Sequence, residues 1–260
     1  HNDFTGFEIQ PSTRVSWTPN FHHNFWGSIS RAVRTPSRWE DDTSLALSPG
    51  FVRILGNRSL KSEKLIAYEI GYRHRPNNNL LFDASTFYND YSDLRTLDFL
   101  TAAQRPADST TAATFGNEAY GESYGFELTV DYDVTNYWSL TSAYTYLSVD
   151  IHRKGENSST PEIDEGTTAK NQFNIRSNLL LPHNVALSNS LFYVDSISAY
   201  GIPPYWRFDS RISWEPKPGL ELSLAGFNLL DESHPEFAEA LHGSRMEVER
   251  SYYFKASMQF

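Results

Sequence analysis

Arginine and aromatic side chains near the ends of alternating segments are the residues of this sequence best suited to ligand chemistry. The candidates for ligand contacts are Arg34, Arg38, Trp39, Arg53, Tyr120, Tyr205, Arg207 and Arg245. Guanidinium groups bind anionic groups through paired hydrogen bonds and attract aromatic faces, so this set suits an anionic, catechol-like or haem-like ligand. The competing interpretation is that Arg34 and Arg207 pair with carboxylates of the protein itself, such as Asp209.

Histidines offer a second kind of chemistry. His22 and His23 are adjacent in a predicted turn, where they could bind a metal ion or simply face solvent. The outer-loop histidines (His152, His234 and His242) have no Ser or Asp placed convincingly beside them, and no histidine lies in the middle of a predicted strand. We therefore expect no catalytic residues, no enzyme activity and no cofactor, and the identity of any bound metal stays unknown.

The segment DESHPEFAEALHGSRMEVE, residues 231–249, contains Pro235, which can open a short helix because proline is tolerated in the first turn. The groups that such a helix would bring together are Asp231, His234, Glu239 and His242. Two interpretations stay open, a cation or ligand contact and a solvated acidic loop.

These candidates must be positioned by the elements around them, and the dominant pattern is a two-residue alternation of apolar and polar side chains. Eleven segments show it: 11–18, 24–34, 65–75, 80–91, 122–133, 137–148, 171–181, 185–194, 204–215, 219–230 and 250–260. Alternation of this kind predicts β-strands with one apolar and one polar face. Their lengths are close to the roughly 9–11 residues that cross a bilayer at a tilt.

The connections between these segments alternate between short and long. The short ones, such as RPNNN and EPKPG, are rich in Pro, Asn and Gly, which favour tight turns. In an up-and-down array, every short turn then lies on one rim and every long loop on the other. This asymmetry is typical of transmembrane barrels with short periplasmic turns and long extracellular loops, and it directs the last strand toward the periplasm.

Aromatic residues are expected at both ends of the strands. Those at the short-turn ends are Trp17, Trp138, Trp214 and Phe260, and those toward the long-loop ends are Tyr91, Tyr124, Tyr146, Tyr193 and Tyr252. Two such belts anchor a barrel at the two membrane interfaces, whereas a soluble sandwich has no reason to sort its aromatic residues. The apolar faces would then meet lipid and the polar faces would line the lumen.

The composition agrees with this interpretation. Aromatic residues make up 15% of the 260 residues although the mean hydropathy is only −0.51. The net charge of −10 argues against a nucleic-acid partner, the absence of cysteine excludes disulfides, and no run of about 18 apolar residues predicts a transmembrane helix.

Several stretches resemble the TonB-dependent outer-membrane receptors, and the resemblance extends over essentially the whole chain. They are WGSISRAVRTPSRWE (26–40), LKSEKLIAYEIGYRHRP (60–76), LLFDASTFYNDYSDL (80–94), YGFELTVDYDVTNYWSLTSAYTYL (124–147), LELSLAGFNLLDESH (220–234) and the terminal Phe260. Ser62 stands where the family often has proline.

This resemblance implies an all-β, antiparallel up-and-down transmembrane barrel of 22 strands with a plug in its lumen, of which about eleven strands are expected here. Residues 1–260 would form the C-terminal part of the barrel, without the plug and the TonB box. The implied partners are outer-membrane lipid, a ferric siderophore or similar chelate, the TonB complex through the plug, and the N-terminal barrel half. The alternatives are a β-rich surface interaction or carbohydrate-binding module and, less well supported by the large loops, a passive porin.

Overall fold

The computed structural model describes residues 1–48, 52–155, 165–238 and 245–259. Its main sheet has 13 described strands, of which eleven follow one another in sequential antiparallel order. These strands are β1 (Ser12–Asn20), β2 (His23–Arg34), β5 (Glu63–Asn77), β6 (Leu80–Phe99), β7 (Thr111–Thr135), β8 (Trp138–Arg153), β9 (Asn171–Leu181), β10 (Val185–Val194), β11 (Tyr205–Lys217), β12 (Leu220–Phe227) and β15 (Ser251–Met258). All eleven predicted strands are therefore confirmed, and the boundaries differ most in β6 and β7, which are longer than expected.

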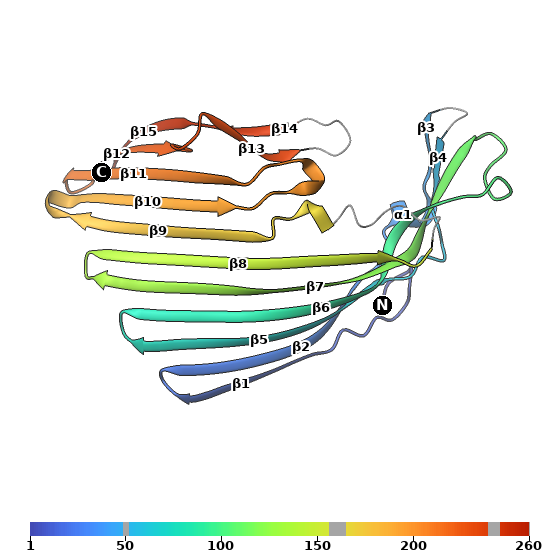
Figure 1. Ribbon diagram of the computed structural model, residues 1–260, viewed down its shortest axis with the longest axis horizontal. Helices are drawn as coiled ribbons and strands as arrows, with labels where there is room; N and C mark the ends of the chain where they lie inside the picture. Colours follow the sequence, from blue (N-terminus) through green and yellow to red (C-terminus); the bar gives the residue numbers. More distant parts are fainter. Residues whose placement is uncertain (49–51, 156–164, 239–244, 260) are drawn as a thin grey trace.

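The alternation of connections is confirmed as well. Figure 1 shows the short turns gathered at one rim and the long loops, α1 and β3–β4 at the other. The last strand runs toward the short-turn rim, as predicted, and the C-terminus lies there. In the part of the chain that is described, no helix is long and apolar enough to cross a membrane.

The long loops contain structure that the alternation did not predict. The connection after β2 contains the helix α1 (Arg38–Asp42) and the hairpin of β3 (Ser44–Ser48) and β4 (Val52–Leu55). The connection after β10 contains the short 3-10 turn η3 (Ser198–Tyr200), and a similar turn, η2 (Pro182–Asn184), joins β9 to β10.

The helix predicted from Pro235 is wrong. Residues 233–238 form strand β13 (Ser233–Ala238), which pairs with β14 (Arg245–Glu249) in a separate two-stranded sheet. Proline is also compatible with an edge strand, because an edge position needs no N–H on one side. Glu239 and His242 lie outside the described residues.

Because paired residues on neighbouring strands lie on the same face, the registers define one polar and one apolar face across the whole sheet. The polar face includes Ser28, Glu69, Asp83, Glu127, Thr141, Arg176, Ser190, Asp209, Ser223 and Lys255. The apolar face includes Val15, Ile29, Ile70, Thr86, Phe126, Leu140, Ile175, Leu187, Ile212, Leu224 and Phe254. An arginine or lysine at the bilayer midplane costs about 2–4 kcal/mol on the lipid side, so the apolar face is the one that meets lipid.

The described belt residues lie on the apolar face, with one correction, and Phe260 lies outside the described residues. From Tyr132 to Tyr124 on β7 the strand rises about 26 Å, comparable with the ~25 Å apolar band of outer-membrane barrels. Tyr91 was predicted in the outer belt, but its register with Gly121 places it on the polar face, where its hydroxyl lies 3.2 Å from Ser123 Oγ. The position of Tyr91 along its strand therefore predicted its height near the outer belt but not the face of the sheet on which it lies.

Above the apolar band, β6 and β7 continue as a two-stranded extension. β4 pairs with this extension in parallel, from Val52 opposite Thr111 to Leu55 opposite Thr114. Ala112, Ala113 and Phe115 are buried here, so the extension has a small core of its own.

The sheet is open. β1 and β15 are its two outer strands, and within the described residues neither pairs with the other.

Candidate functional site

The polar face contains charge pairs along the strands. Arg73 Nε donates to Asp83 Oδ2 at 2.7 Å, and Arg211 Nη2 donates to Glu221 Oε1 at 2.7 Å. Each pair joins neighbouring strands on the polar face. The polar face therefore carries charges of both signs, some of them paired across strands, which suits the lining of a water-filled or plugged lumen.

A buried carboxylate organises the first cluster at the long-loop rim. Glu40 in α1 is only 1% exposed and accepts hydrogen bonds from Arg34 Nη1 at 3.0 Å and Arg95 Nη1 at 2.9 Å. The same carboxylate closes a capping box with Ser37, whose backbone N–H donates to it at 2.7 Å. Arg34 also donates to both oxygens of Glu63 on the next strand. We call these five residues the Glu40 cluster.

The electrostatics of the Glu40 cluster favour the ionised carboxylate. Burial by itself would raise the pKa of Glu40. Hydrogen bonds from Ser37 and Arg95, together with the charge of Arg34, outweigh burial and lower this pKa to about 2. The cluster thus fastens α1 to the ends of β2 and β6 through a permanent negative charge.

A second cluster lies at the same rim on β11. Arg207 donates to both oxygens of Asp209, at 3.1 and 2.9 Å, and its Nη1 lies 3.6 Å from Glu236 Oε1 on β13. His234 stacks on the ring of Tyr205 with a centroid distance of 4.3 Å. We call these five residues the β11 cluster; it joins the β13–β14 hairpin to the wall of the barrel.

Two polar atoms next to the β11 cluster are buried without a hydrogen-bond partner. They are Asn228 Oδ1 and His234 Nδ1. Asn228 is fully buried with a φ of 52°, and its Nδ2 donates to the backbone oxygen of Val248 at 3.0 Å. The backbone N–H of Asn228 donates to Asp209 at 2.9 Å, so this residue ties the end of β12 to both β11 and the hairpin.

The structure brings the predicted ligand residues into separate groups. Arg34 belongs to the Glu40 cluster, and Arg207 and Tyr205 belong to the β11 cluster. The pairing of Arg207 with Asp209 is the interpretation that competed with direct ligand contact. Arg53 on β4 likewise donates to Asp108 at 2.8 Å and to Ser44 at 3.0 Å.

The remaining predicted residues are more exposed. Arg38 and Trp39 project from α1, with Trp39 half exposed. Arg245 begins β14 and its guanidinium reaches the turn at Gly201. Tyr120 lies on the same outward face as Tyr124, so its side chain is not among the residues that face the lumen.

Sequence reasoning missed the residues that organise both clusters, namely Glu40, Arg95, Asn228 and Glu236. One signal was present, because Ser37 followed by Glu40 three residues later is a capping-box pattern. Arg95 and Asn228 have no comparable local pattern, since their partners come from distant strands.

The described histidines have partners other than a metal centre. Within the described ranges, no group of three or more His, Asp or Glu residues could hold a metal ion. His22 Nδ1 lies 2.6 Å from the backbone oxygen of Arg75, and His23 stacks on His74 at 4.5 Å. His234 is paired with Glu236 at 3.0 Å.

An eleven-strand antiparallel array with long loops on one rim and a charge-paired polar face is the geometry of a receptor barrel wall. The family model described as "TonB dependent receptor-like, beta-barrel" matches residues 1–229. The chain belongs to this family. Its members are outer-membrane receptors and transporters rather than enzymes, and the resemblance seen in the sequence is confirmed.

Two curated relatives of this receptor-barrel chain have names that refer to a siderophore or to iron. A probable TonB-dependent siderophore receptor of Acinetobacter baumannii is 20% identical over 201 residues, which cover 72% of this chain and 25% of the relative. An iron-regulated outer membrane virulence protein of Vibrio cholerae is 26% identical over 158 residues, 56% of this chain and 23% of the relative. The chain therefore spans about a quarter of the length of these relatives.

Solved structures share the fold of this receptor barrel. A variant of the ferric enterobactin receptor of Pseudomonas aeruginosa, in complex with enterobactin, has a TM-score of 0.75 at 15% identity and covers 99% of this chain and 41% of its own. The FrpB iron transporter of Neisseria meningitidis has a TM-score of 0.74 at 15% identity, with 97% and 39% covered. The ferric-catecholate import receptor Fiu of E. coli K12 has a TM-score of 0.71 at 17% identity, with 96% and 34% covered.

Proposed function

We propose that this chain forms the C-terminal part of the barrel wall of an outer-membrane receptor that takes up a ferric siderophore or a similar metal chelate. The rest of the protein would supply the remaining strands, a plug in the lumen and the contact with TonB. Completion by further strands is physically required, because open strand edges in lipid leave backbone groups unpaired.

One observation carries the proposal about ligand class. At the long-loop rim, α1 presents the exposed guanidinium group of Arg38 and the half-exposed ring of Trp39. An exposed guanidinium group and an exposed aromatic face suit an anionic, aromatic chelate, because they offer donors in a planar fork and a surface for stacking. The names of the relatives, which include siderophore and ferric-enterobactin receptors, support the same class.

The test is uptake of radioactive iron by a strain that carries the full-length receptor as its only chelate receptor. Catecholate, hydroxamate and haem complexes would be compared, each with and without TonB. We expect TonB-dependent uptake of a catecholate complex. TonB-independent passage of all three would contradict the proposal and indicate a passive pore.

Residue contributions can be tested in the same strain. Replacement of Arg38 or Trp39 by Ala should weaken binding of the chelate, whereas Lys217→Ala, near the short-turn end of β11, is the control. Equal binding by the three variants would remove α1 from the ligand site.

A further inference from the structure

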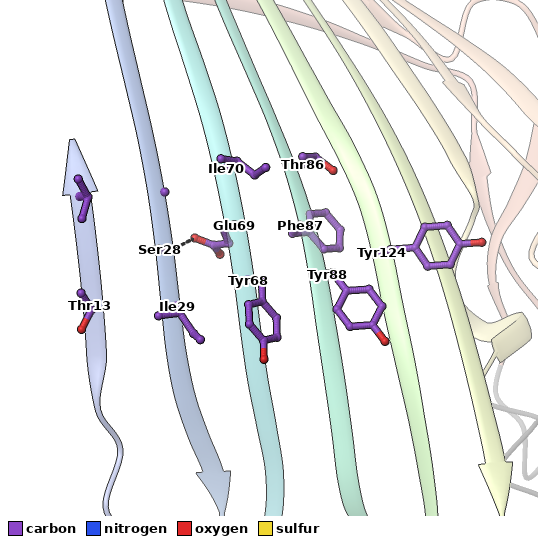
Figure 2. A pocket seen from close by; sticks show the side chains of 12 residues that line it. Thr13, Ser28, Ile29, Tyr68, Glu69, Ile70, Thr86, Phe87, Tyr88 and Tyr124 are labelled. Carbon is purple, nitrogen blue, oxygen red and sulfur yellow. Dashed lines mark hydrogen bonds between the residues drawn. The ribbon is translucent and has the colours of Figure 1, made fainter. Parts of the chain in front are cut away.

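The wall has hollows on both of its faces. A hollow on the apolar face is shown in Figure 2, where Tyr68 and Ile70 of β5 lie beside Thr86 and Tyr88 of β6. This face meets lipid, so that hollow needs no other occupant. Another hollow, of about 450 Å³, lies at the short-turn rim, and its volume is within the range of small-molecule sites, about 300–1,000 Å³. We call it the rim hollow.

The rim hollow lies between the turns that join β5 to β6 and β7 to β8, next to the end of β9 (Figure 1). Backbone hydrogen bonds fix these walls. The N–H of Asp133 donates to the backbone oxygen of Asn79 at 2.8 Å, and the N–H of Leu180 donates to the backbone oxygen of Tyr137 at 2.7 Å. Because both turns are tied to neighbouring strands, the rim hollow is formed before any ligand binds.

The lining of the rim hollow offers hydrogen-bond acceptors and negative charge. Asp133 is opposite Ser139, and Ser139 is opposite Asn178, so these three side chains lie on the polar face. Among the described residues, the carboxylate of Asp133 has no hydrogen-bond or ion-pair partner, and no lysine or arginine lines the hollow. An unpaired carboxylate beside amide and hydroxyl oxygens is complementary to a cationic group that carries several N–H donors.

Tyr137 gives the rim hollow an aromatic wall. Its side chain is 59% exposed in the turn between β7 and β8, although it is a large aromatic residue. The face of such a ring attracts a guanidinium or ammonium group. Leu180 also lines the hollow and is equally exposed, so it offers an apolar contact for the methylene groups that carry a cation. A carboxylate, a ring face and an apolar surface therefore meet in one hollow.

We propose that the rim hollow binds a guanidinium or primary ammonium group, with Asp133 as the ion-pair partner and Tyr137 as the stacking surface. Two sources carry this chemistry, namely an arginine or lysine side chain of a polypeptide and the end of a free polyamine. The hollow lies at the rim opposite to α1, so this site is independent of the chelate contacts proposed above, and either proposal can fail without the other.

The test measures binding of a fluorescently labelled triarginine peptide to the full-length receptor in detergent, with labelled trialanine as the control peptide. Asp133→Asn keeps the shape of the side chain and removes its charge, and it should weaken binding of triarginine about tenfold. The matched control is Asp131→Asn, which loses the same charge on the same strand and face. Its carboxylate accepts from Thr141 at 2.9 Å and does not line the hollow, so binding should change about twofold at most.

Variants of Tyr137 separate stacking from attraction between charges. Tyr137→Phe keeps the ring and should bind triarginine as the wild type does, whereas Tyr137→Ala should weaken binding about threefold. Displacement of triarginine by spermidine would identify a polyamine as a sufficient ligand, and binding that spermidine does not reduce would identify a polypeptide side chain. Equal losses in Asp133→Asn and Asp131→Asn would overturn the proposal, because they would reflect only the overall negative charge. Unchanged binding by Asp133→Asn would overturn it as well.

Discussion

Replacement of Glu40 should release α1 from the barrel wall without unfolding the strands. Glu40 is buried and holds Arg34, Arg95 and the amide of Ser37. A pKa that falls from its ordinary 4.5 to about 2 corresponds to about 3 kcal/mol of preferential stabilisation of the ionised carboxylate. Loss of the carboxylate removes the acceptor of the Ser37 amide and of Arg95, whereas Arg34 keeps its hydrogen bonds to Glu63.

The assay is hydrogen exchange of the peptide that contains residues 37–43, read by mass spectrometry. About 3 kcal/mol corresponds to a roughly hundredfold increase in the fraction of time that the amides of Glu40 and Asp41 are open, and Glu40→Ala should show it. The matched control is Asp42→Ala in the same helix, whose side chain lies 3.9 Å from the exposed Arg38. An exposed pair of this kind is worth less than about 1 kcal/mol, so exchange should change by a few-fold at most. Equal exchange in the two variants would refute the argument from burial.

The same carboxylate predicts a dependence on pH. Because the pKa of Glu40 is lowered in the folded protein, the unfolded form binds more protons in acid. The stability contributed by Glu40 is therefore complete above pH 4.5 and is lost as the pH falls toward 2. Cleavage by pepsin within residues 35–62 should rise across this window in the wild type and should already be maximal at pH 4.5 in Glu40→Ala. Cleavage in the wild type that does not depend on pH would contradict the assignment.

Three further changes test the packing of the wall and the hairpin. Gly71→Ala should lower the temperature at which the barrel loses its heat-modifiable gel mobility. A Cβ at this position would overlap the indole of Trp26, and overpacking costs about 1–3 kcal/mol. Gly27→Ala is the control, because a Cβ there has room. Asn228→Ala should destabilise the end of β12 by about 1–3 kcal/mol, measured by hydrogen exchange, through the loss of a buried hydrogen bond at a positive φ, and Asn228→Gly should recover part of this loss. Glu236→Gln should lower the free energy of opening of the β13–β14 hairpin by less than about 1 kcal/mol, since the contact between Glu236 and Arg207 is long and partly exposed. A larger loss would show that this ion pair, and not the stacking of His234 on Tyr205, holds the hairpin.

The strands of the wall could be predicted from sequence because their information is local. A two-residue alternation fixes both the strand and its two faces, and the short turns are marked by residues such as Pro76 and Asn77. The pairing of Arg207 with Asp209 is also local, since residues two apart on a strand share a face.

The rim could not be predicted in the same way. Pro235 is compatible with the first turn of a helix and with an edge strand, so the local sequence does not choose between them. The strand that is found makes contacts with distant segments, such as the stacking of His234 on Tyr205. The Glu40 cluster joins residues from one loop and three strands, so its geometry exists only after the sheet has formed. The face of Tyr91 depends on its register with Gly121, which position along the strand alone does not give.

The parallel pairing of β4 with β7 has a mechanical consequence. Along the sheet, β2 and β7 are separated by β5 and β6, but the loop that leaves β2 returns above the membrane and pairs with β7 through β4. Strands in a barrel can slide past one another only by breaking register in whole steps that reverse their faces. The pairing of β4 with β7 beyond the lipid surface therefore restrains β2, β5, β6 and β7 relative to one another. These four strands should therefore move as one rigid unit, and any widening of the complete barrel would have to take place between other strands.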